Sequence, residues 1–184
     1  ITKVALIGAG NMGSGIAQKI ATEGVPVVLV DASLERAQAG KDRISALLEE
    51  GVTRKIFRPE QVAAILERIT PAGSPEEAAD VDLVIEAIFE DLEIKRSLFK
   101  KLSEVCRPDT ILATNTSSFL VEDIAEGIPN PERMIGLHFF YHPAKNRLVE
   151  VIGHKGSSQA VLKAAWAFQE RVGKTPIASA DAPG

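Results

Sequence analysis

Short runs of β-branched and aliphatic residues alternate along this chain with longer segments of helical periodicity. A strand covered on both faces is apolar throughout, whereas a surface helix repeats its apolar residues about every 3.6 positions. The pattern predicts strands at 2–8, 25–31, 81–87, 110–115, 133–140, 147–153 and 175–179, with a weaker one near residue 69. It predicts helices at 11–24, 33–51, 92–106 and 157–173.

The order of these elements indicates the fold class. Strands that alternate with helices form βαβ units, whose strands lie parallel and whose helices cover both faces of the sheet. We therefore expect an α/β fold with a doubly wound, mostly parallel sheet and an antiparallel hairpin in its C-terminal part. Gly24, Gly51 and Gly173 are expected to end helices, and the proline-bearing segments 58–61 and 70–78 to be connectors.

The composition narrows the choice of partners. The 184 residues are 45% hydrophobic, so we expect residues 1–184 to form a single domain around one core. A formal net charge of −4 argues against nucleic-acid partners and anionic membranes, and no apolar run is long enough to span a bilayer. The single cysteine, Cys106, fits a reducing, cytoplasmic location and is expected to fill the core. We expect no metal site.

The stretch GAGNMGSGIA joins the first predicted strand to the first predicted helix. A Gly-x-Gly-x-x-Gly spacing in this context favours a dinucleotide-binding turn of the Rossmann type. Gly8 permits the tight turn, Gly10 the close approach of a pyrophosphate, and Gly13 the close packing of helix on strand. The helix that begins at Asn11 and Met12 then directs its N–H groups and partial positive charge at the phosphates.

An acidic residue at the end of the second predicted strand favours one dinucleotide. Asp31 lies 18 residues after Gly13, where a carboxylate accepts hydrogen bonds from the ribose hydroxyls of adenosine. The same carboxylate repels a 2′-phosphate, so the sequence predicts NAD rather than NADP as the cofactor. The alternative is a structural turn followed by a surface aspartate.

One histidine has the position of a catalytic base. An enzyme that oxidises an alcohol needs a base near the hydroxyl, and histidine titrates in the useful range. His138 ends a predicted strand, and Glu150 follows 12 residues later. If the two strands form an antiparallel hairpin about Ala144, these side chains are cross-strand neighbours, and the carboxylate fixes the imidazole tautomer. From spacing alone, a core histidine satisfied by a glutamate is an equal alternative.

Polar residues follow the strand at 110–115. Ligands bind at the carboxyl ends of parallel strands, so Asn115, Ser117 and Ser118 are candidates to reach a hydroxyl or a nicotinamide ribose. An equal alternative is that Ser117 or Ser118 caps a helix around 119–126.

Several of these segments together resemble one enzyme family. GAGNMGSGIA, Asp31, IEAIFEDLEIKRSLF, ATNTSS, GLHFF and LVEVI occur in the order and spacing of the NAD-binding domain of L-3-hydroxyacyl-CoA dehydrogenases. The likeness runs from about residue 2 to the end of the chain. It implies NAD-linked oxidation of a 3-hydroxyacyl-CoA to the 3-oxoacyl-CoA, in fatty acid β-oxidation or related acyl-CoA metabolism. Family members occur alone or fused behind an enoyl-CoA hydratase.

The resemblance also implies roles for single residues. His138 matches the family's general base, Glu150 its partner, and Ser117 the serine that bonds near the substrate oxygen and the nicotinamide. Glu90 and Lys95 match residues that line the cofactor site, although Lys95 could instead lie on a solvated helix face.

Nearer the N-terminus, the family pattern makes Arg54 and Lys55 candidates for contacts to CoA, with a solvated charged patch as the alternative. Where many members read HFFNP this chain reads HFFYHP, so Tyr141 replaces an asparagine of the cofactor pocket and His142 follows it. We take His138 rather than His142 as the base, because the neighbours of His138 are apolar and its spacing to Glu150 fits.

The family's enzymes are longer than this chain. They continue with a Phe-rich segment, a catalytic asparagine and a helical domain that covers the substrate and forms the dimer interface. The resemblance thus implies that this chain binds NAD but by itself turns over poorly or not at all, and that the full-length protein is a homodimer. Two other functions stay open: an NAD-dependent dehydrogenase of a non-CoA hydroxy acid, and a nucleotide-binding module without catalysis.

Overall fold

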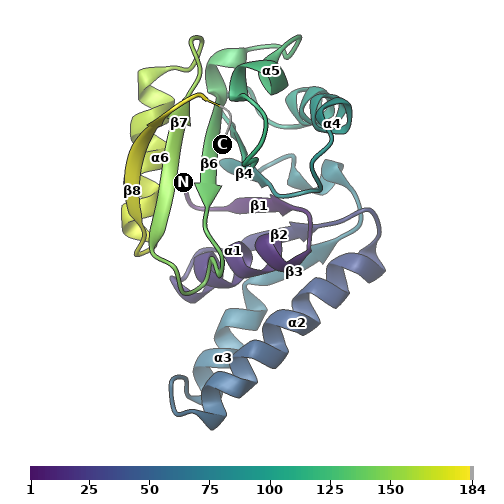
Figure 1. Ribbon diagram of the computed structural model, residues 1–184. Helices are drawn as coiled ribbons and strands as arrows, with labels where there is room; N and C mark the ends of the chain where they lie inside the picture. The colour runs from purple at the N-terminus through teal and green to yellow at the C-terminus, as the bar shows by residue number, and fades with distance from the viewer. Residues whose placement is uncertain (183–184) are drawn as a thin grey trace.

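A computed structural model describes residues 1–182, so that the last two residues of the predicted domain lie outside the described range. An eight-stranded sheet with helices on both faces forms its centre (Figure 1). The strands are β1 (Val4–Ile7), β2 (Val27–Val30), β3 (Ile69–Ala72), β4 (Leu83–Glu86), β5 (Ile111–Thr114), β6 (Met134–Phe139), β7 (Leu148–Gly153) and β8 (Thr175–Ala180). The helices are α1 (Asn11–Thr22), α2 (Leu34–Thr53), α3 (Pro59–Glu67), α4 (Leu92–Val105), α5 (Val121–Ala125) and α6 (Gln159–Arg171), with 3-10 turns η1 (Pro75–Ala78) and η2 (Pro131–Arg133).

The strand order is β3-β2-β1-β4-β5-β6-β7-β8. Strands β1 to β6 pair in parallel, β7 runs antiparallel to β6, and β8 runs parallel to β7. This arrangement confirms the predicted doubly wound α/β sheet with an antiparallel hairpin in its C-terminal part. Because the strand order reverses between β1 and β4, their carboxyl ends open into the crevice where ligands bind in such sheets.

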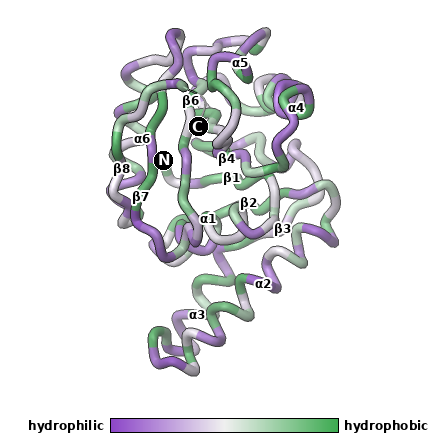
Figure 2. The backbone as a smooth tube through the Cα atoms, in the orientation of Figure 1, coloured by the Kyte–Doolittle hydropathy of each residue, from purple (hydrophilic) through white to green (hydrophobic). Residues whose placement is uncertain are grey.

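Alternate residues of the strands pack into two apolar layers. Leu6 and Ile85 point to the layer under α1, α2, α3 and α6, whereas Ile7 and Val84 point to the layer under α4 and α5. Figure 2 shows β1 and β2 as mainly apolar, while polar and apolar stretches alternate along α2. Cys106 lies in the second layer, where burial raises the pKa of its thiol, which confirms the predicted core position.

The glycines predicted to end helices do so in two of three cases. Gly24 and Gly173 follow the ends of α1 and α6 with φ of 91° and 73°, the left-handed conformation that glycine adopts without strain. The prediction for Gly51 is wrong, because α2 continues to Thr53. A Cβ at position 51 would lie 2.6 Å from the ring of Phe57, so glycine there makes room for the chain that folds back.

The predicted connector at 58–61 is the start of a helix. Pro59 is the first residue of α3, where its missing N–H would have no partner in any case. The N–H of Arg58 donates to the side chain of Gln61 at 2.9 Å, which caps the helix. Proline therefore marks a helix beginning here rather than a loop. The second predicted connector, 70–78, contains the end of β3 and the turn η1.

Asp82 ties the N-terminal segment to the start of β4. Its carboxylate accepts hydrogen bonds from the Thr2 N–H at 2.6 Å and from Arg107 at 2.7 Å. Burial acts to raise the pKa of Asp82, but the hydrogen bonds outweigh it and lower the pKa from 3.8 to about 2. Since the folded-state pKa is the lower one, this stabilisation is complete above the ordinary value and is lost as the pH falls toward 2.

Replacing Asp82 with Asn is expected to lower the free energy of unfolding at neutral pH by about 1 kcal/mol, a figure that allows for solvent screening. The variant should also lose less stability than the parent between pH 4 and 2, the interval set by the two pKa values. Urea unfolding at several pH values measures both effects. Equal acid sensitivity of parent and variant would contradict the assignment.

Candidate active site

Two adjoining cavities lie at the carboxyl edge of the sheet. The first, of 450 Å³, is lined by Gly8, Gly10 and Asp31 among others, and we call it the Asp31 cavity. The second, of 310 Å³, is lined by residues that include Ser117 and His138, and we call it the His138 cavity. Both are lined by the residues that follow β4, Ala87 and Ile88, so an elongated ligand can extend from one into the other.

The glycine turn forms one end of the Asp31 cavity. Gly8 has a φ of 106°, and a Cβ on Gly13 would lie 1.7 Å from the carbonyl oxygen of Gly8, so neither position accepts a side chain. A Cβ on Gly10, in contrast, would meet no atom within 4 Å. The N-terminus of α1, at Asn11, therefore faces open space, and its unpaired N–H groups suit a phosphate. Met12, one residue on, reaches the His138 cavity.

The carboxylate of Asp31 is held at the end of β2 by three groups. It accepts the N–H of Ala9 at 2.8 Å and the N–H of Ala32 at 2.7 Å, and the Nε of Arg36 lies 3.2 Å away. Its side chain keeps 16% of its surface exposed toward the cavity it lines. The residue is thus oriented by the turn and still able to accept hydrogen bonds from a ligand.

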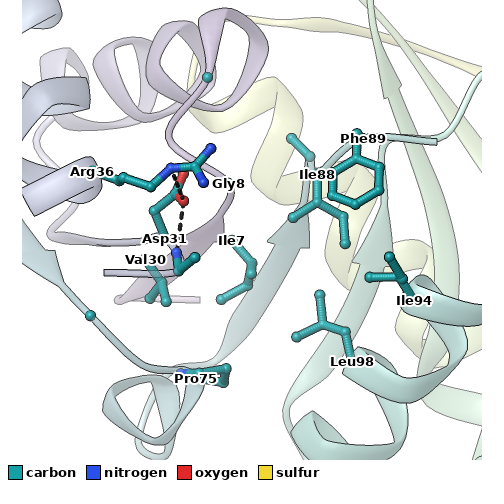
Figure 3. A pocket seen from close by; sticks show the side chains of 14 residues that line it. Ile7, Gly8, Val30, Asp31, Arg36, Pro75, Ile88, Phe89, Ile94 and Leu98 are labelled. Carbon is teal, nitrogen blue, oxygen red and sulfur yellow. Dashed lines mark hydrogen bonds and ion pairs between the residues drawn. The ribbon is translucent and has the colours of Figure 1, made fainter. Parts of the chain in front are cut away.

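The opposite wall of this cavity is apolar. Figure 3 shows Asp31 and Arg36 on one side and Phe89, Ile94 and Leu98 on the other. Phe89 and Ile94 are large apolar side chains that are exposed in this cavity. An apolar slot opposite an oriented carboxylate suits an adenosine, whose base is flat and whose ribose carries two hydroxyls.

His138 and Glu150 are paired as predicted. They are direct partners in the antiparallel register of β6 and β7, and His138 Nδ1 lies 2.6 Å from Glu150 Oε2. The ring of Phe140 stands 4.7 Å from the imidazole, at a tilted angle. Because Nδ1 is engaged by the carboxylate, Nε2 is the ring nitrogen left for a ligand.

The other two histidines do not line the His138 cavity. His142 Nδ1 accepts the N–H of Ala144 at 3.2 Å, and burial together with nearby lysines lowers the pKa of His142. His154 contacts the carbonyl of Pro131 at 3.0 Å, at the far end of β7. Geometry therefore favours His138 as the histidine that can act on a bound molecule.

The polar residues after β5 join the same cavity. Asn115 Oδ1 accepts the N–H of Phe139 at 2.8 Å, which ties the end of β5 to the end of β6. Ser117 is exposed on the cavity wall, and its N–H donates to Glu90 at 3.2 Å. The capping alternative for Ser117 and Ser118 is wrong, because α5 begins only at Val121.

Instead, a residue near the C-terminus caps α5. The carboxylate of Asp181 accepts the N–H groups of Val121 and Glu122 at 2.7 and 2.9 Å. The sequence offers no local signal for this cap, because the two segments are 60 residues apart.

A buried ion pair between Lys95 and Glu86 lies beside the His138 cavity, and the sequence analysis did not predict this pairing. Lys95 is 1% exposed, and its Nζ lies 2.5 Å from Glu86 Oε1 and 3.6 Å from Glu90 Oε2. Lys95 therefore does not lie on a solvated helix face. Glu86, which is fully buried, also accepts the Thr114 hydroxyl at 2.7 Å and the Ile88 N–H at 2.8 Å. An acid within the apolar run LVIEA is the signal that could have revealed it, because a buried carboxylate needs a cation.

The basic candidates for CoA lie elsewhere. Arg54 pairs with Glu50 and lines a hollow of 210 Å³, together with Gln18 and Lys145. Lys55 is exposed in the turn between α2 and α3, with a φ of 61°, and does not line this hollow. Neither residue lines the Asp31 cavity or the His138 cavity.

Within residues 1–182, no three potential metal ligands among the His, Cys, Asp and Glu side chains come together. No helix in the same range has the length and apolar character needed to cross a membrane.

Comparison with known proteins decides the family. A family model described as "3-hydroxyacyl-CoA dehydrogenase, NAD binding domain" matches residues 3–182. The chain belongs to this family. The family is one of NAD-binding domains, so NAD is the cofactor of this chain, and both the resemblance and the predicted cofactor are confirmed.

Individual relatives agree with the family. A 3-hydroxybutyryl-CoA dehydrogenase of Clostridioides difficile is 37% identical over 99% of this chain and 65% of the relative. A 3-hydroxyadipyl-CoA dehydrogenase of Escherichia coli K12 is 41% identical over 100% of this chain and 39% of the relative. The crystal structure of a 3-hydroxybutyryl-CoA dehydrogenase from Escherichia coli matches with a TM-score of 0.96 and 42% identity, again over 100% of this chain and 39% of that one. The chain thus spans less than two thirds of these dehydrogenases.

The residues present fit NAD. The open space above Gly10 leaves room for a pyrophosphate that a Cβ would fill, and the oriented Asp31 carboxylate suits ribose hydroxyls. The His138 cavity adjoins this site and provides polar groups for the remaining part of a dinucleotide.

Proposed function

We propose that a protein containing this domain oxidises an L-3-hydroxyacyl-CoA to the 3-oxoacyl-CoA with NAD, in fatty acid β-oxidation or related acyl-CoA metabolism. The observation that carries the proposal is the His138–Glu150 pair, 2.6 Å apart, whose histidine lines a cavity that adjoins the Asp31 cavity. The names of the relatives, which refer to 3-hydroxybutyryl-CoA, 3-hydroxyadipyl-CoA and fatty acid oxidation, support the substrate class.

In this proposal residues of both cavities would hold the cofactor. The glycine turn and the first turn of α1 hold the pyrophosphate, and Asp31 holds the adenosine ribose. The nicotinamide end is held by residues of the His138 cavity, of which we assign Glu90, Lys95, Asn115 and Ser117. When bound, NAD would supply the acceptor for the hydride of the carbinol carbon of the substrate.

His138 removes the proton of the substrate hydroxyl. Its Nε2 accepts this proton, while Glu150 holds the N–H at Nδ1, fixes the ring orientation and stabilises the imidazolium that forms. The hydroxyl of Ser117 donates a hydrogen bond to the substrate oxygen from the cavity wall. Phe140 covers one side of the imidazole and limits the access of water.

The CoA part of the substrate is assigned to the projecting end of α2. The planar guanidinium of Arg54 suits a phosphate, and Lys145 lines the same hollow from the segment between β6 and β7. Lys55 adds a second positive charge in the adjacent turn.

The whole relatives contain residues beyond the matched region, since the chain covers 39% and 65% of two of them. We propose that such residues complete the substrate site and form a homodimer in the full-length protein. The 184-residue chain by itself is then expected to bind NAD and to oxidise a 3-hydroxyacyl-CoA slowly.

The test of the function combines two measurements on this chain. Calorimetry with NAD should show binding, and NADH formation from 3-hydroxybutyryl-CoA should be slow compared with an intact relative. Absence of NAD binding would overturn the proposed function. A rate close to that of the intact relative would overturn only the proposal that further residues are needed.

Replacing Asp31 with Ser is expected to change the cofactor preference. The substitution removes the acceptor for the ribose hydroxyls and frees Arg36, whose side chain is 71% exposed, to meet a 2′-phosphate. We expect NAD affinity to fall about tenfold, the loss of about 1.4 kcal/mol, and NADP affinity to rise. Fluorescence titration with NADH and NADPH measures both. The double variant with Arg36→Ala is the control and should lose the gain in NADPH affinity.

A further inference from the structure

A buried lysine outside the proposed machinery has no carboxylate partner. Lys174 lies between α6 and β8 and is 5% exposed. None of the ion pairs formed within residues 1–182 includes it. Burial, with a smaller effect from Lys19, lowers the pKa of Lys174 to about 8. Since an unpaired buried ammonium is unfavourable, the groups that it binds must explain its presence.

Lys174 binds the backbone of the segment 140–147, which joins β6 to β7. Its Nζ donates to the carbonyl oxygens of Pro143 and Asn146, the latter at 2.7 Å. It also lies 5.4 Å from the centre of the Phe139 ring, at the end of β6. Hydrogen bonds from a charged donor are stronger than neutral ones, so this ammonium fixes two points of the segment firmly.

The same segment forms part of the wall of the His138 cavity. Phe140 and Tyr141 line that cavity. On its other side the segment packs closely on α1, because a Cβ on Gly15 would lie 2.6 Å from Pro143 Cγ. The segment is thus in contact with α1 and bonded to Lys174, and a change in either contact would move the cavity wall.

We propose that Lys174 is a positioning residue of the active site: its ammonium group anchors the segment 140–147, so that Phe140 and Tyr141 stay in place beside His138 at the nicotinamide end of the cofactor. The identity of the ligand rests on the proposed function, whereas the anchoring of the segment does not.

The test compares Lys174→Met, which removes the charge and the donors, with Lys174→Arg, which keeps both. Lys174→Gln, made in parallel, keeps one donor group without the charge. Lys163→Met is the matched control, since it makes the same change at an exposed position of α6. Tyr141 is the one tyrosine in the sequence, so a carbon-13 label in the tyrosine ring reports on the segment alone. The affinities for NADH and for ADP-ribose, which lacks the nicotinamide, are measured for each variant.

We expect Lys174→Met to raise the Kd for NADH about fivefold or more, as loss of a charged hydrogen bond would, and to leave the Kd for ADP-ribose unchanged. The ring signals of Tyr141 should shift or broaden in the same variant. The Arg variant should resemble the parent, the Gln variant should lie between, and Lys163→Met should have no effect.

Unchanged NADH affinity and Tyr141 signals in Lys174→Met would overturn the proposal, as would an equal loss for both ligands. Unfolding of both the Met and the Gln variants would also overturn it, because a positioning role leaves the domain folded. If the parent bound NADH no more tightly than ADP-ribose, the assignment of the nicotinamide end would fail instead. The Tyr141 signals would then decide the role of Lys174 by themselves.

Discussion

Replacing Gly13 with Ala is expected to abolish NAD binding and to lower the free energy of unfolding by about 3 kcal/mol, the upper range for overpacking. The added Cβ would lie 1.7 Å from the carbonyl oxygen of Gly8, well inside the contact distance of the two atoms. That oxygen belongs to the backbone of the turn and cannot rotate away as a side chain would. Helix α1 must then move off β1, and the N–H groups that we propose to bind the phosphates move with it. Urea unfolding and calorimetry with NAD measure the two losses.

The matched control is Gly10→Ala in the same turn. A Cβ at position 10 meets no atom within 4 Å, so the unfolding free energy should change by less than about 0.5 kcal/mol. NAD affinity should nevertheless fall, because the methyl group occupies the space assigned to the pyrophosphate. If both variants bound NAD like the parent, the turn would not be the pyrophosphate site. A loss of stability in Gly10→Ala equal to that in Gly13→Ala would contradict the packing argument.

Replacing His138 with Gln is expected to lower kcat by about 10²- to 10⁴-fold, the usual contribution of a general base. Glutamine keeps a polar group of similar size at the end of β6 but cannot take up the hydroxyl proton. NAD affinity should stay close to that of the parent, because the contacts proposed for adenosine and pyrophosphate are made by residues of the other cavity. Steady-state kinetics with a 3-hydroxyacyl-CoA, in a preparation that turns it over, and calorimetry with NAD separate the two effects.

His154→Gln serves as the control, since His154 lies at the far end of β7 and contacts the carbonyl of Pro131. It should leave kcat unchanged. A His138→Gln enzyme with the parent's kcat would overturn the role of the base and leave a binding module as the better account. A parallel loss of NAD affinity would show that the substitution disturbs the fold of the crevice.

The two largest expected effects arise from features that the sequence shows locally. The glycine spacing, the strand before it and the helix after it occupy one short stretch, and Asp31 ends the next strand. The separation of 12 positions from His138 to Glu150 suffices to predict their pairing, because an antiparallel hairpin brings residues equidistant from its turn face to face. Apolar runs of strand length, separated by helical periodicity, likewise predicted the parallel order of the sheet.

Other features of the site depend on residues that meet only in the folded chain. Glu86 and Lys95 neutralise each other in the interior, and Asp181 caps a helix 60 residues earlier. Lys174 reaches carbonyl groups about 30 residues before it. Gly51 was predicted to end a helix, but its lack of a side chain instead leaves room for the ring of Phe57, which packs back onto the helix.

The sequence by itself thus determined the class of fold, the glycine turn between the first strand and helix, the cofactor NAD and the pairing of His138 with Glu150. Each of these depends on short-range periodicity or on the spacing of a few residues. Only the tertiary structure decided which charged groups are buried, what they bind and which basic residue lines a hollow. Burial and long-range pairing depend on how elements distant in the sequence pack together, and local sequence patterns do not predict that packing.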